Sequence, residues 1–110
     1  MINITQKEII KKINDIKTLK HIFIIDTDND FTYDMFNNNE NIFIIKTISI
    51  DLIKEWCYSY FNILKILSKE KLFNQTVFML IINCKKYNKF DLNIFELINN
   101  IGSKVYIIGE

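Results

Sequence analysis

Thr76-Val-Phe-Met-Leu-Ile-Ile-Asn83 is the stretch that decides the fold of this chain. Its six central residues are all apolar, and polar and apolar positions do not alternate. Polar and apolar residues alternate in a strand that has one face in water, but not in a strand that is covered on both faces. The stretch therefore predicts the central strand of a sheet that carries helices on both faces.

Three further stretches resemble this one in composition, namely His21–Asp26, Ile42–Ile48 and Lys104–Ile108. The apolar periodicity of amphipathic helices occurs before the first of these stretches, in residues 5–18, and between the later ones, in residues 49–69 and 91–102. Strands that alternate with helices favour a parallel sheet. We therefore expect a single three-layer α/β domain over residues 1–110, with a mostly parallel sheet of four strands and helices on both faces.

Capping residues indicate where the helices begin and end. Thr5, with Glu8 three residues later, forms a capping-box pattern that starts the first helix. Ser49 is suited to cap the second helix. We expect Asp91 to cap the third helix and Gly102 to end it in a left-handed conformation.

The segment 30–41 permits two interpretations. Phe31, Tyr33 and Met35 alternate with polar residues, which is the period of a strand and would add an antiparallel hairpin strand at 31–36. Alternatively the segment forms a short helix, capped at its first residue, that keeps the next strand parallel. We expect the helix, because a crossover connection suits the continuous apolar runs on both sides of the segment.

Composition and charge disfavour nucleic acid as a partner. All 14 basic residues are lysines, and the chain also has 13 acidic residues, so the net charge is only +1. Such a chain has no strong field to attract nucleic acid or an anionic membrane. Without arginine it also lacks the rigid fork that makes bidentate contacts with guanine or phosphate.

Membrane insertion and secretion are not indicated either. Each apolar run is far shorter than the roughly 20 residues that cross a bilayer, and the first residues lack the features of a secretory signal. Cys57 and Cys84 are expected to be free thiols, because a small secreted domain would usually carry more cysteines. We therefore expect a protein of the cytoplasm, of a cell or of its host, without membrane association.

Polar side chains follow three of the predicted strands. The first strand is followed by Asp26, Asp28 and Asp30, the second by Thr47, and the third ends in Asn83. Parallel strands end at a common edge, where α/β proteins bind their ligands, so we expect these residues to share one rim. A divalent cation would relieve the repulsion between the carboxylates, with Asp26 and Asp28 as its ligands. Alternatively the aspartates form a turn, or a charged surface for a partner.

The acidic stretch also carries a short resemblance to two enzyme families. Ile25-Asp26-Thr27-Asp28-Asn29 resembles the first acidic motif of PIN-like and NYN ribonucleases, where an aspartate after the first strand helps to hold a metal ion. The same residues are similar to the Asp-x-Asp motif of haloacid-dehalogenase phosphatases, whose first aspartate is the nucleophile and second the acid. The resemblance implies, as an alternative function, a metal-dependent phosphoesterase or nuclease that uses Asp26 and Asp28.

The leading hypothesis is an interaction or regulatory module that acts by protein–protein binding, without catalysis and without a cofactor. The sequence contains no complete catalytic set, and its two glycines, Gly102 and Gly109, cannot form a phosphate-binding loop. The expected partner is another protein or a second copy of the chain. The candidate contact residues are aromatic residues near the margins of the predicted elements, namely Tyr33, Phe36, Tyr58 and Phe61.

Overall fold

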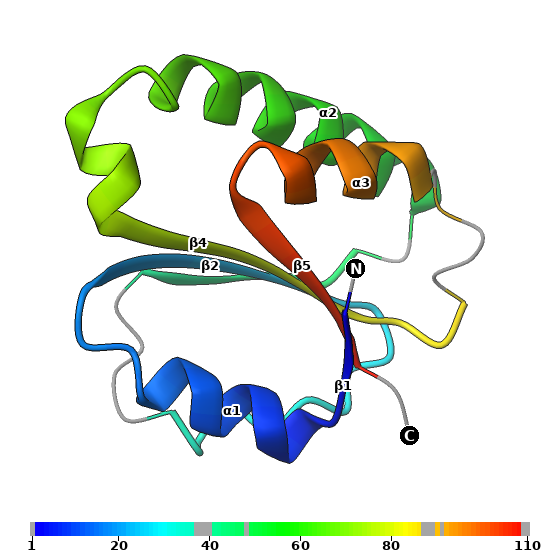
Figure 1. Cartoon of the computed structure of the whole chain (residues 1–110). Coiled ribbons are helices and arrows are strands. Elements are labelled where there is room, and N and C mark those ends of the chain that lie inside the picture. The colour runs from blue at the N-terminus through cyan, green and yellow to red at the C-terminus, as the bar shows by residue number, and fades with distance from the viewer. Residues whose placement is uncertain (1, 37–40, 48, 87–89, 91, 109–110) are drawn as a thin grey trace.

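The computed structural model describes residues 2–36, 41–47, 49–86, 90 and 92–108. These residues form a three-layer α/β arrangement, which confirms the predicted fold class (Figure 1). The sheet lies in the middle. In the view of Figure 1, helix α1 (Gln6–Asn14) lies below it, and helices α2 (Ile50–Leu67) and α3 (Leu92–Asn100) lie above it.

The described part of the chain forms a sheet of five parallel strands, so the expected number of four is wrong. The strand that the sequence did not predict is β1, whose three residues are too few to show a pattern. The strand predicted from the longest apolar run is β4, which lies in the centre of the sheet and is buried from residue 78 to residue 83. In spatial order the strands are β1 (Ile2–Ile4), β5 (Ser103–Ile108), β4 (Thr76–Asn83), β2 (Leu19–Asp26) and β3 (Ile42–Ile45).

The connection from β2 to β3 has neither of the two conformations that the sequence suggested for residues 31–36, which form neither a helix nor a strand. The parallel direction that the favoured interpretation expected is confirmed, because β3 pairs with β2 in parallel. Residues 37–40 lie outside the described part of the chain. Phe31 and Phe36 are buried against α1, which also binds this segment through hydrogen bonds. Gln6 Oε1 accepts the Thr32 N–H at 2.9 Å, for example. Apolar anchoring to α1 thus replaces the regular structure that the alternating pattern suggested.

The sheet separates two apolar cores. The upper core lies between the sheet and the facing sides of α2 and α3, and it contains the buried thiols of Cys57 and Cys84, which are not linked in a disulfide. The lower core contains Ile9, Ile10 and Ile13 of α1. Each core therefore covers one face of β4, which explains why this strand is apolar without alternation.

The predicted caps of the first two helices are confirmed. Thr5 Oγ1 accepts the Glu8 N–H at 3.2 Å, and Ser49 Oγ accepts the Leu52 N–H at 3.3 Å. The predicted cap of the third helix, Asp91, lies outside the described residues. Among the helices that the structure describes, none combines the length and the apolar character needed to cross a membrane.

We expect Gly102→Ala to lower the free energy of unfolding by about 2 kcal/mol. Gly102 has a φ of 123°, which L side chains rarely adopt, and an added Cβ would lie 2.8 Å from Phe73 Cζ. Equilibrium unfolding in urea measures the effect. The control is Asn100→Ala at an exposed helix position nearby, which should change the free energy by less than about 0.5 kcal/mol. Equal unfolding midpoints for the two variants would contradict the prediction.

Candidate functional site

The polar residues that follow the strands lie at one edge of the sheet. Asp26 and Asn83 are register partners at the ends of β2 and β4, and Thr47 comes shortly after the end of β3. This edge, which we call the polar rim, is at the right of the sheet in Figure 1. The parallel direction of the strands brings these residues to the same end.

Asp26 is the centre of the polar rim. Its side chain is only 1% exposed, and its Oδ1 accepts Asn83 Nδ2 at 2.7 Å and the Asn29 N–H at 3.0 Å. The Tyr33 hydroxyl donates to Oδ2. Burial, and next the hydrogen bond to Asp26, raise the pKa of Tyr33 above its usual range, so the phenol stays protonated and remains a donor. Both oxygens of Asp26 thus already accept hydrogen bonds from the protein.

The other two aspartates tie the loop after β2 to the end of β4. Asn83 Nδ2 donates to Asp30 Oδ1 at 2.6 Å, and the Lys85 N–H donates to Asp28 Oδ2 at 2.8 Å. The described residues contain no group of three or more His, Cys, Asp or Glu side chains that could hold a metal ion. The geometry of the polar rim is therefore that of a hydrogen-bonded loop anchor, with Asp26 as its buried acceptor.

The four aromatic candidates for partner binding do not share one surface. Phe36 is buried in the lower core, and Tyr33 packs against the same core while it donates to Asp26. Phe36 is therefore not accessible to a partner. Tyr58 and Phe61 belong to α2, on the opposite face of the sheet, where Tyr58 is exposed and the Lys65 ammonium lies 5.2 Å from the Phe61 ring centroid.

An apolar groove of about 740 Å³ lies at the end of the sheet opposite the polar rim. It runs between α2 and the first residues of β2 and β4, and it is bordered by the 3-10 helix η1 (Lys71–Gln75). His21 contributes to its lining from β2. Leu19, Ile63 and Leu72 also line it, and they remain 50%, 52% and 65% exposed. The groove thus presents large aliphatic side chains to solvent.

The groove continues towards an open edge of the sheet. The ring of His21 stacks with Phe78, at a centroid distance of 5.6 Å, and with Phe43, at 6.4 Å. Phe43 belongs to β3, which has a neighbour on one side only within the described sheet, and its side chain is 45% exposed. The apolar surface therefore extends from η1 to β3.

Sequence reasoning did not select the residues of this groove. Leu19 and Leu72 are far apart in the chain, and each lies outside the periodic patterns that the sequence shows. The available signal was Leu72-Phe73, an apolar pair within the polar stretch that separates α2 from β4. His21, near the start of β2, belongs to the groove lining as well.

The chain was also compared with known proteins. It has no significant match among protein-family models, curated proteins or solved structures. The short acidic resemblance in residues 25–29 is thus not accompanied by a wider similarity to the families that it suggested.

Proposed function

We propose that this protein is a small interaction module that binds a protein partner through the apolar groove, without catalysis. The observation that carries the proposal is the exposure of Leu19, Ile63 and Leu72 along one continuous hollow. Scattered exposed apolar residues are normal on a protein surface, but contiguous ones bordered by polar residues mark interaction sites.

The apolar side chains supply the free energy of binding in this proposal. Covering the exposed half of a leucine or isoleucine side chain contributes about 1 kcal/mol. Leu19, Ile63 and Leu72 come from β2, α2 and η1, so a bound segment contacts three separate elements at once. β2 and α2 are held by buried residues, and Phe73 of η1 packs against the upper core, so the groove is preformed and loses little conformational entropy on binding.

The charges at the border of the groove favour an acidic partner segment. Lys69 and Lys71 line the groove together with Glu70, so cationic groups outnumber anionic ones at this border. Electrostatic complementarity then favours a segment that carries carboxylates beside its apolar side chains. The exposed edge of β3 lies beside the groove, and such an edge can pair with an extended chain.

The proposal predicts that Ile63→Glu and Leu72→Glu weaken partner binding by at least about tenfold. A carboxylate in the groove would lose its hydration when the partner covers it, and it would also repel an acidic segment. The measurement is affinity capture from an extract of the native cell, followed by quantitative binding of the captured protein. Sedimentation velocity measures, in parallel, whether the partner is a second copy of the chain.

Leu97→Glu is the matched control, because Leu97 is 44% exposed on α3 and does not line the groove. The control is expected to bind as the wild-type protein does. The proposal is overturned if the groove variants keep wild-type affinity, or if the control loses as much as they do. It is also overturned if the wild-type protein binds no protein and remains a monomer at high concentration.

A further inference from the structure

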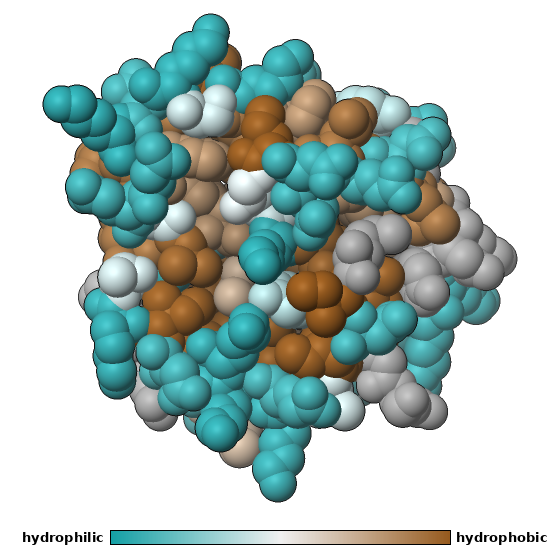
Figure 2. Space-filling model, viewed as in Figure 1, coloured by the Kyte–Doolittle hydropathy of each residue, from teal (hydrophilic) through white to brown (hydrophobic). Residues whose placement is uncertain are grey.

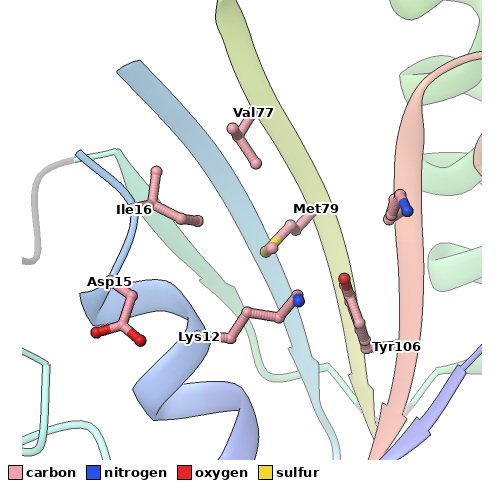
Figure 3. Close-up of a pocket in the computed structure, with 7 residues that line it drawn as sticks. Lys12, Asp15, Ile16, Val77, Met79 and Tyr106 are labelled. Atoms are coloured by element: carbon pink, nitrogen blue, oxygen red, sulfur yellow. The ribbon is translucent and has the colours of Figure 1, made fainter. Parts of the chain in front are cut away.

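A second hollow, of about 480 Å³, lies on the α1 side of the sheet (Figure 3). Its floor is formed by Val77 and Met79 of β4 and by Tyr106 of β5, and α1 borders it with Lys12. Figure 2 shows uncovered apolar atoms in the band where the sheet lies in Figure 1, with polar side chains around them. This hollow, which we call the lysine pocket, is separated from the apolar groove by the sheet.

Two ammonium groups belong to the lysine pocket. Lys12 Nζ lies 6.0 Å from the Tyr106 ring centroid, and Figure 3 shows the Lys12 side chain extended towards the sheet. Lys104 is the register partner of Met79, so both side chains are on the same face of the sheet. Within the described residues, neither ammonium has a carboxylate at ion-pairing distance. In Figure 3 the carboxylate of Asp15, at the border of the pocket, points away from Tyr106.

Tyr106 supplies a hydrogen-bond donor that the rest of the described protein does not use. The residue is only 2% exposed, its hydroxyl is directed into the lysine pocket, and it has no hydrogen-bond partner among the described residues. The Tyr106 ring packs in the lower core, but its hydroxyl is not among the buried polar atoms that lack a partner, so it reaches the open space of the lysine pocket. The Tyr60 hydroxyl, by contrast, lies 2.8 Å from Ser103 Oγ inside the upper core. The Tyr106 hydroxyl is therefore placed where it can donate to water or to a ligand in the pocket.

Burial also keeps the Tyr106 hydroxyl in its donating form. It raises the pKa of Tyr106 above the ordinary value for tyrosine, so the phenol is protonated at neutral pH. Apart from the carboxylate of Asp15 at the border, the polar groups that line the pocket are then cationic or neutral donors. Donors of this kind suit the oxygen atoms of an anion.

We propose that Lys12, Lys104 and Tyr106 form a binding site for a small organic anion. The carboxylate or phosphate of the ligand accepts hydrogen bonds from the two ammonium groups and the phenol, and its apolar part covers Val77 and Met79. The volume of the pocket lies within the range of small-molecule sites. The site is independent of the proposed protein-binding groove, because it lies on the other face of the sheet and shares no lining residue with it.

The test is a titration of the isotope-labelled full chain with phenyl phosphate, hexanoate and inorganic phosphate, followed by amide chemical shifts. We expect saturable shifts at Lys12, Met79 and Tyr106 with phenyl phosphate or hexanoate, and weaker binding of inorganic phosphate, which lacks the apolar part. Comparison of the two organic probes shows whether the site prefers phosphate or carboxylate. Lys12→Gln, Lys104→Gln and Tyr106→Phe should each weaken binding by about tenfold, since each removes a hydrogen bond to a charged group.

Lys11→Gln is the matched control, because Lys11 lies beside Lys12 on α1 and does not line the pocket. It changes the net charge equally and is expected to leave the affinity unchanged. Tyr106→Phe keeps the buried ring, and its thermal unfolding is measured to show that the fold is intact. The proposal is overturned if neither organic probe gives saturable shifts, if Lys11→Gln weakens binding as much as Lys12→Gln, or if Tyr106→Phe binds like the wild-type protein.

Discussion

Leu80→Ala is expected to lower the free energy of unfolding by about 4 kcal/mol. Leu80 is fully buried in the middle of β4, between its register partners Phe23 and Val105, and its side chain belongs to the upper core. Truncation removes apolar contacts and leaves a cavity that sheet and helices cannot easily close. A domain of this size is stable by about 5–15 kcal/mol in total, so the loss is a large part of its stability. Equilibrium unfolding in urea measures it.

Leu97→Ala is the control for this prediction, because it makes the same chemical change at a half-exposed position of α3. This control should lower the free energy of unfolding by less than about 1 kcal/mol, because it removes little apolar surface from the interior. If both variants lost the same stability, the assignment of β4 as the buried centre of the sheet would be wrong.

Asp26→Ala is expected to lower the free energy of unfolding by about 3 kcal/mol. The substitution removes the acceptor for three donors, the amide of Asn83, the N–H of Asn29 and the hydroxyl of Tyr33. Asn83 is itself 5% exposed, so its amide would lose one of its two carboxylate partners inside the protein. The loss should appear as a lower unfolding midpoint in urea with an unchanged dependence on urea concentration.

The matched control is Asp28→Ala, in the same loop. Asp28 is exposed, and its carboxylate accepts the Lys85 N–H. Asp28→Ala should lower the free energy of unfolding by less than about 1 kcal/mol, because water can replace an exposed hydrogen bond. A loss for Asp28→Ala that equals or exceeds the loss for Asp26→Ala would show that Asp26 is not the central acceptor of the polar rim.

Regular elements were predictable where the local pattern and the tertiary environment agree. The apolar run of β4 is continuous because α1 covers one face of the sheet and α2 and α3 cover the other. The first two helices begin at Thr5 and Ser49 because capping is a local interaction between residues three positions apart. Such signals do not depend on the remainder of the fold.

Segments whose structure depends on residues far away in the chain were not predictable from local patterns. Residues 31–36 alternate like a strand, but their conformation follows from the burial of Phe31 and Phe36 beside α1, which is far away in the sequence. β1 has only three residues, and it is a strand because β5 offers it an edge to pair with. In both cases a partner that is distant in the chain decides the local structure.

The sequence by itself determined the layered fold, the parallel direction of the strands and hence the common edge at which Asp26 and Asn83 meet. Tertiary structure decided which hydrogen bonds those residues form, because the hydrogen bond from Asn83 to Asp26 joins positions 57 residues apart. It also decided which side chains line the groove and the lysine pocket. Leu19, Ile63 and Leu72, like Lys12, Lys104 and Tyr106, come together only when helices and strands pack. Periodicity shows which face of an element is apolar, but exposure depends on how much of that face the neighbouring elements cover.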